Sequence, residues 1–123
     1  MLHIIGIPNC DKIRATKKWL TERDIEFEFI DVKKEPLTLE EIQELEFKVG
    51  VDVLVNSRGT TYRNLKIKDQ NLDKDELLCV LVENQSMIKR PVLVHEESVL
   101  VGYDEEAFEN FLKENNLVDN QED

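Results

Sequence analysis

The N-terminal part of the chain shows a strand-helix-strand pattern, and this pattern restricts the fold more than any other feature. Residues 2–7 form a short apolar run that is typical of a buried strand. Residues 11–23 place their apolar side chains on one helical face, and residues 26–32 alternate apolar with polar side chains as a strand does. Strand, helix and strand within about thirty residues make a βαβ unit, whose two strands run parallel.

The C-terminal part predicts a hairpin and a final helix. Residues 91–95 and 98–101 are two apolar runs joined by two glutamates, which favours an antiparallel pair. Asp104 is expected to cap a helix that runs to about Asn115. A parallel unit and a hairpin can share one sheet, so we expect an α/β fold with a mixed four-stranded sheet.

The middle of the chain predicts helices. Thr38 and Glu41 have the spacing of a capping box, and the helix that they begin is expected to end at Gly50. Residues 73–83 predict another helix, capped by Asn71 or Asp73, whereas the polar residues 57–64 are expected to be irregular.

The length of 123 residues is typical of one domain. We therefore expect a single domain over residues 1–118, with a helical insertion at about 38–85 and a frayed tail at 119–123. The six large aromatic side chains outside the tyrosines are expected to lie in the core. They are Trp19, Phe27, Phe29, Phe47, Phe108 and Phe111.

The charge and the cysteines narrow the classes of function. Sixteen Lys and Arg against 27 Asp and Glu give a net charge of -11, which disfavours direct binding to nucleic acid or to anionic membranes. No signal peptide or membrane-length apolar run is present in the sequence, and Cys10 and Cys79 form no disulfide framework or metal motif. We expect a cytoplasmic monomer with reduced thiols and no metal; His3 and His95 are interpreted as core or edge residues.

Cys10 is the leading candidate for chemistry. It follows a predicted strand and begins a predicted helix, where free backbone N–H groups and the helix dipole stabilise an anion. A cysteine in such a place has a lowered pKa and reacts as the thiolate. Arg14, one turn later, adds positive charge and is a candidate anion-binding residue, and Lys12 adds a further positive charge. The alternative is an inert buried thiol. Cys79 lies in an apolar run and is interpreted as a buried structural thiol, with a resolving role as the lesser alternative.

Four segments of the chain resemble the family of glutaredoxin-coupled arsenate reductases, which includes the Spx regulators and the YffB-like proteins. They are residues 6–14 around Cys10, residues 56–65, which begin Asn-Ser-Arg-Gly-Thr-Thr, residues 88–91 and residues 101–103. The order and spacing of the segments are compatible with the family over nearly the full chain, and the second segment is most similar to the YffB-like branch.

The resemblance implies a thioredoxin-like fold with a helical insertion and a nucleophilic Cys10. It implies that Arg58 and Arg90 bind an anionic group, and that Pro91 is a cis-proline facing the cysteine. Arginine suits this role because its guanidinium is planar and always charged. The alternative for both arginines is a surface position paired with carboxylates.

Three positions depart from the family's specialised branches. Gly6 stands where arsenate reductases carry a histidine, and Gly102 where they carry a third anion-binding arginine. Both departures argue against arsenate as the substrate. Ile13 stands where the redox-switched Spx proteins have the second cysteine of Cys-x-x-Cys, so no local disulfide can form.

Two functions follow as hypotheses. The first is a thiol-dependent oxidoreductase that binds no cofactor and uses glutathione, glutaredoxin or thioredoxin to release the Cys10 adduct. The second is an Spx-like regulatory protein that binds the RNA polymerase alpha subunit without turnover.

Overall fold

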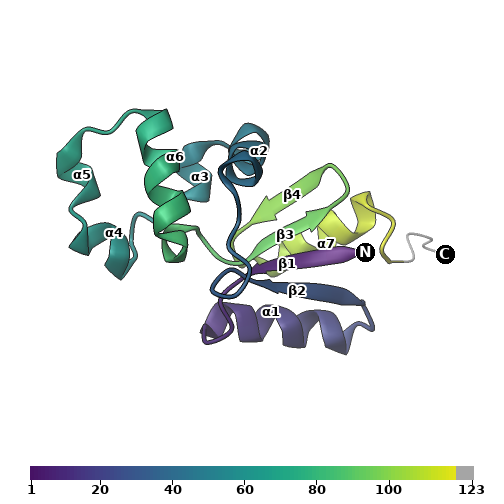
Figure 1. The fold of residues 1–123 in the computed structure, drawn as a ribbon. Coiled ribbons are helices and arrows are strands. Elements are labelled where there is room, and N and C mark those ends of the chain that lie inside the picture. Colours follow the sequence, from purple (N-terminus) through teal and green to yellow (C-terminus); the bar gives the residue numbers. More distant parts are fainter. Residues whose placement is uncertain (119–123) are drawn as a thin grey trace.

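The computed structural model describes residues 1–118 and places four strands of this part of the chain in one mixed sheet (Figure 1). The strands are β1 (Leu2–Gly6), β2 (Phe27–Asp31), β3 (Val92–His95) and β4 (Ser98–Val101). Their order is β2-β1-β3-β4, with β1 parallel to β2 and antiparallel to β3, and with β3 and β4 antiparallel. The predicted mixed four-stranded sheet is confirmed.

Helices lie in two groups relative to this sheet. The first group is α1 (Asp11–Glu22) and α7 (Glu105–Glu114), which share one hydrophobic cluster with the sheet. The second group follows β2 in the chain and extends beyond one end of the sheet (Figure 1). It consists of α2 (Leu39–Val49), α3 (Val51–Leu54), α4 (Thr60–Asn64), α5 (Ile67–Gln70), α6 (Lys74–Glu83) and the 3₁₀ turn η1 (Gln85–Met87). Within residues 1–118, none of these helices is both long and apolar enough to cross a membrane.

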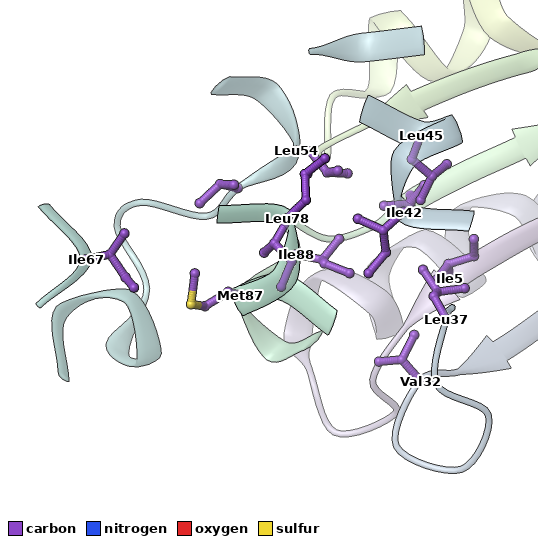
Figure 2. Close-up of a cluster of buried hydrophobic side chains, with 13 residues drawn as sticks. Ile5, Val32, Leu37, Ile42, Leu45, Leu54, Ile67, Leu78, Met87 and Ile88 are labelled. Carbon is purple, nitrogen blue, oxygen red and sulfur yellow. The ribbon is translucent and has the colours of Figure 1, made fainter. Parts of the chain in front are cut away.

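The sheet has two apolar faces because side chains alternate along each strand. On β1, the fully buried Ile4 packs in the cluster with α1 and α7, whereas Ile5 packs on the other face with the helical segment. Val92 and Leu93 on β3 divide in the same way. Figure 2 shows the second cluster, which joins the sheet to α2, α3, α5 and α6.

The helix ends follow the predicted capping residues. Thr38 and Glu41 form a reciprocal capping box at the start of α2, and the helix ends at Gly50 with φ of 88°. Asp73 and Asp104 accept hydrogen bonds from the first-turn amides of α6 and α7. These residues fix where the helices begin, so the element boundaries agree closely with the sequence pattern.

Two local expectations were wrong. Residues 57–64 were expected to be irregular, but Thr60–Asn64 form the short helix α4. Phe47 was expected in the core, yet its side chain is 84% exposed, because α2 turns Ile42 and Leu45 inward and Phe47 lies on the opposite side. Trp19, Phe108 and Phe111 are buried as expected, and Phe27 and Phe29 are partly buried. The predicted frayed tail at 119–123 lies outside the described residues.

Candidate functional site

Cys10 is the N-cap residue of α1, directly after the loop that follows β1. Its backbone is extended, with φ of -141° and ψ of 130°, and its carbonyl accepts the first helical hydrogen bond from Arg14 N at 3.0 Å. The side chain is partly buried and does not belong to the fully enclosed core. The sulfur therefore lies where the free amides of a helix start meet the solvent.

Three neighbours stabilise the thiolate of Cys10. Partial burial raises the pKa of this thiol, but hydrogen bonds from the amides of Ile13 and Lys12 and from the Arg90 guanidinium lower it. The positive charge of Arg90 lowers it further, and the net result is a pKa below the ordinary value of a cysteine. Both the helix start and a side chain far along the sequence thus favour the reactive form.

A cavity of about 240 Å³ opens in front of the sulfur. Its lining residues are Cys10, Asp11, Lys12, Asn56, Lys89 and Arg90. Three of them are cations and one is a carboxylate, so the cavity is locally basic in a chain whose net charge is -11. Such a cavity favours an anionic ligand over a neutral one. Within residues 1–118, no group of three or more His, Cys, Asp and Glu side chains could hold a metal ion.

Arg90 is held beside Cys10 by the turn before β3. Its Nη1 donates a hydrogen bond to the carbonyl of Ser86 at 2.8 Å, and its stem passes close to the backbone of Gly6. The Arg90–Pro91 peptide bond is cis, and Pro91 is buried. The cis bond agrees with what the resemblance implied, whereas the role of Pro91 at the site stays a prediction.

Asn56 and Lys89 reach the cavity because two distant segments pair. Val55 and Ile88 form an isolated antiparallel bridge. Asn56 N donates to the carbonyl of Met87 at 2.7 Å, and Lys89 N donates to the carbonyl of Leu54 at 2.8 Å. The end of the helical segment α2–α3 is thereby tied to the chain that enters β3, next to Arg90.

Gly6 has no space for a side chain. A Cβ at this position would overlap Cδ1 of Ile13, which is fully buried against β1. The side chain of Ile13 therefore occupies the space that a histidine at position 6 would need. The same packing explains why position 13 is apolar and forms no disulfide with Cys10.

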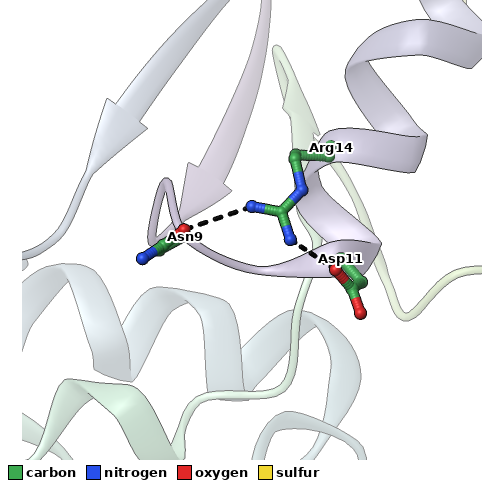
Figure 3. Close-up of polar contacts among 3 residues, drawn as sticks. All are labelled: Asn9, Asp11 and Arg14. Carbon is green, nitrogen blue, oxygen red and sulfur yellow. Dashed lines mark hydrogen bonds and ion pairs between the residues drawn. The ribbon is translucent and has the colours of Figure 1, made fainter.

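Arg14 contacts two neighbours near the start of α1. Its guanidinium contacts the carboxylate of Asp11 and donates a hydrogen bond to Asn9 Oδ1 at 3.2 Å (Figure 3). Arg14 is not among the residues that line the cavity. The anion-binding role of Arg14 therefore stays a prediction: the side chain lies one turn after the thiol, and its guanidinium contacts Asp11.

The structure leaves the prediction for Arg58 open and overturns the prediction that Cys79 is buried. Arg58 is exposed, does not line the cavity, and contacts its neighbours through its backbone, donating to Asn56 Oδ1 and accepting from Arg63. A role for its guanidinium in anion binding stays a prediction. Cys79 was expected to be buried, but it is exposed, because α6 buries only the face that carries Leu78 and Leu81.

Asn56 and Lys89 were not predicted as site residues. Lys89 directly precedes Arg90, and Asn56 begins the second segment of the family resemblance, which contains Arg58. Each therefore lies close in sequence to a predicted anion-binding arginine. The signal that could have found them is this adjacency. Nothing in the local pattern indicates that the segments around 55 and 88 pair.

Replacing Arg90 with glutamine is expected to raise the pKa of Cys10, since the variant loses both a hydrogen bond and a positive charge at the thiolate. The measurement is the pH dependence of alkylation by iodoacetamide, in a Cys79→Ser background. Arg23→Gln, at the opposite end of α1, is the matched control and should leave the midpoint in place. An unchanged midpoint in Arg90→Gln would show that Arg90 does not act on the thiol.

Known proteins resemble this chain over most of its length. An uncharacterised protein of Haemophilus influenzae is 39% identical over 89% of this chain and 96% of its own. The global transcriptional regulator Spx of Staphylococcus haemolyticus is 30% identical over 91% of this chain and 87% of its own. The solved structure of a YffB protein superposes with a TM-score of 0.84 at 29% identity, covering 89% of this chain and 97% of that one.

These similarities and the mixed sheet with its flanking helices define a thioredoxin-like fold. The model of the ArsC family matches residues 5–111. The chain belongs to the ArsC family.

Proposed function

We propose that this chain is a thiol-dependent oxidoreductase in which Cys10 is the nucleophile. The observation that carries the proposal is the position of Cys10: its pKa is lowered, and it faces a cavity lined by Lys12, Lys89 and Arg90. Thiol–disulfide exchange requires a thiol that is accessible to a ligand, and it is favoured by a lowered pKa because the thiolate is the attacking form.

The proposed reaction is a two-step exchange. The Cys10 thiolate attacks one sulfur of a disulfide, forms a mixed disulfide with it, and releases the other sulfur as a thiolate. A second thiol then attacks the mixed disulfide and regenerates the Cys10 thiolate. Over these two steps one reductant thiol replaces one thiol of the substrate disulfide. A second reductant thiol then attacks the resulting mixed disulfide, so the substrate gains two electrons and the two reductant thiols lose them as they join in a disulfide. Glutathione is the proposed reductant for the second step, directly or through glutaredoxin or thioredoxin.

The charge at the cavity supports a sulfur substrate over arsenate. Arg90 is the one guanidinium that lines it, and the other two cations are lysines. Guanidinium groups bind tetrahedral oxyanions through paired N–H donors, whereas a lysine ammonium acts as a point charge. The cavity therefore offers positive charge without the set of paired donors that an arsenate site would use.

The test is to treat the reduced protein with glutathione disulfide and to map the modified cysteine by mass spectrometry over time. Because Cys79 is also exposed, the rate and not the final extent is decisive. We expect Cys10 to be modified first at pH 7 and to be released by added glutathione. Modification of Cys79 before Cys10 would contradict the proposal.

A second function is favoured by the similarity to Spx over most of both chains. A regulatory protein that binds the RNA polymerase alpha subunit would not need the Cys10 thiolate. Its test is capture of the purified alpha subunit by the wild-type protein and by Cys10→Ser. Equal capture by both, without disulfide turnover by the wild type, would favour the regulator over the oxidoreductase.

A further inference from the structure

Lys89 lines the Cys10 cavity and forms no ion pair within residues 1–118. It lines the cavity with Cys10 and Arg90, and its backbone is fixed by the hydrogen bond to Leu54. The ion pairs among residues 1–118 involve other basic residues, and none includes Lys89. Its charge is therefore not neutralised by a carboxylate of this part of the protein.

The end of the Lys89 side chain lies beside Gly102. A Cβ on Gly102 would lie 3.5 Å from Lys89 Cε and 3.9 Å from Nζ, so the end of the lysine rests over the glycine backbone. Gly102 has φ of 100° and donates its N–H to the carbonyl of Pro91 at 2.8 Å. The ammonium group of Lys89 therefore lies beside the glycine, next to the cavity.

The balance of charge at the cavity is positive even when Cys10 is ionised. Lys12, Lys89 and Arg90 supply three positive charges. The thiolate offsets one of them, and the carboxylate of Asp11, which also lines the cavity and contacts Arg14, offsets at most one more. An anionic group on the substrate is thus attracted after the thiolate has formed.

A second cavity of about 140 Å³ shares Asn56 and Arg90 with the first. Hydroxyl groups line much of it, from Thr60, Thr61, Tyr62 and Ser86. The shared residues place the two cavities next to each other. A ligand that extends from the sulfur into the second cavity would meet neutral donors and acceptors, which suits the polar body of a larger molecule and not a compact oxyanion.

We propose that Lys89 is a substrate-binding residue that selects disulfides carrying a carboxylate. This inference rests on the proposed function and adds its substrate class. Lys89 binds the carboxylate as a point charge while Cys10 attacks the sulfur, and the remainder of the substrate lies toward the hydroxyl-lined cavity. Neutral and cationic disulfides lack this contact.

The test compares three disulfides of different charge in the Cys79→Ser background. They are glutathione disulfide, which is anionic, bis(2-hydroxyethyl) disulfide, which is neutral, and cystamine, which is cationic. The measured quantity is the second-order rate of mixed-disulfide formation at Cys10. Lys89→Gln is expected to lower the ratio of the anionic to the neutral rate about fivefold, as expected for one partly exposed charge pair. Lys89→Arg should restore the ratio, and Lys68→Gln on α5 should not change it.

The outcomes separate the inference from the proposed function. An unchanged ratio in Lys89→Gln, with Cys10 still reactive, overturns the role of Lys89 and leaves the oxidoreductase in place. An equal fall in all three rates would show that Lys89 acts on the thiol, and would also overturn its role in selecting the substrate. Failure of all three disulfides to react at Cys10 in the unsubstituted Lys89 protein overturns the proposed function and, with it, this inference.

Discussion

Replacing Cys10 with serine is expected to lower the rate of glutathione-dependent disulfide reduction at least about a thousand-fold, as loss of a nucleophile does in other enzymes. A serine hydroxyl stays protonated near neutral pH and cannot form the mixed disulfide. The hydrogen-bonding amides of Ile13 and Lys12 remain in the variant, so the fold at the start of α1 is preserved. The measurement is the steady-state rate at which glutathione reduces bis(2-hydroxyethyl) disulfide, followed as the glutathione disulfide that the reaction forms.

The matched control for this variant is Cys79→Ser, which also removes one exposed thiol. Cys79 lies on α6, within the helical segment, and does not line the Cys10 cavity. Its replacement is expected to leave the rate unchanged. Equal activity of Cys10→Ser and the wild-type protein would contradict a catalytic role for Cys10, and a loss of activity in Cys79→Ser would assign it a resolving role.

Replacing Phe108 with alanine is expected to lower the free energy of unfolding by about 3–5 kcal/mol. Phe108 is fully buried on α7, and its ring makes edge-to-face contacts with Trp19 and Tyr103 at centroid distances of 5.3 Å and 5.1 Å. The substitution removes these contacts and leaves a cavity between α7, α1 and the sheet. A loss of this size is a large fraction of the total stability of a small domain.

Phe47→Ala is the matched control for Phe108→Ala, because the chemical change is identical and the side chain is 84% exposed. It is expected to change the free energy of unfolding by no more than about 0.5 kcal/mol. Chemical denaturation of both variants gives the comparison. Similar losses at the two positions would contradict the assignment of Phe108 to the core and of Phe47 to the surface.

The difference between Phe108 and Phe47 also shows which parts of the fold could be predicted. Alternation in strands and capping residues such as Thr38 and Asp104 are local signals, and the structure follows them. Phe47 is large and apolar, as core residues are, but α2 buries the face that carries Ile42 and Leu45. Which face of a helix is covered depends on tertiary packing, which a single aromatic residue does not reveal.

The site was only partly predictable from the sequence, because some of its residues follow from local patterns and others depend on long-range packing. Cys10 follows from a local pattern, since a cysteine between a strand and a helix lies at a helix start. Arg90 was selected through the family resemblance, and the structure brings it to Cys10. Asn56 and Lys89 depend on the pairing of Val55 with Ile88, which joins segments far apart in the sequence. Such long-range contacts leave no periodic signal in the chain.

The two glycines that depart from the arsenate reductases have physical explanations in the structure. At Gly6 a Cβ would overlap the buried Ile13, and Gly102 has φ of 100°, a conformation that favours glycine, with the end of Lys89 beside it. In both places a neighbouring side chain lies where a larger residue would extend. The departures are therefore consistent with a site adapted to a different substrate, as the proposed function states.

The central claim is that the first turn of α1 and Arg90 hold the sulfur of Cys10 in its thiolate form. The most direct measurement is the thiolate absorbance of the Cys79→Ser protein as a function of pH, with Cys10→Ser/Cys79→Ser as the baseline. We predict a midpoint clearly below the value of about 8.5 that is usual for a free cysteine. A midpoint at or above that value would contradict the claim.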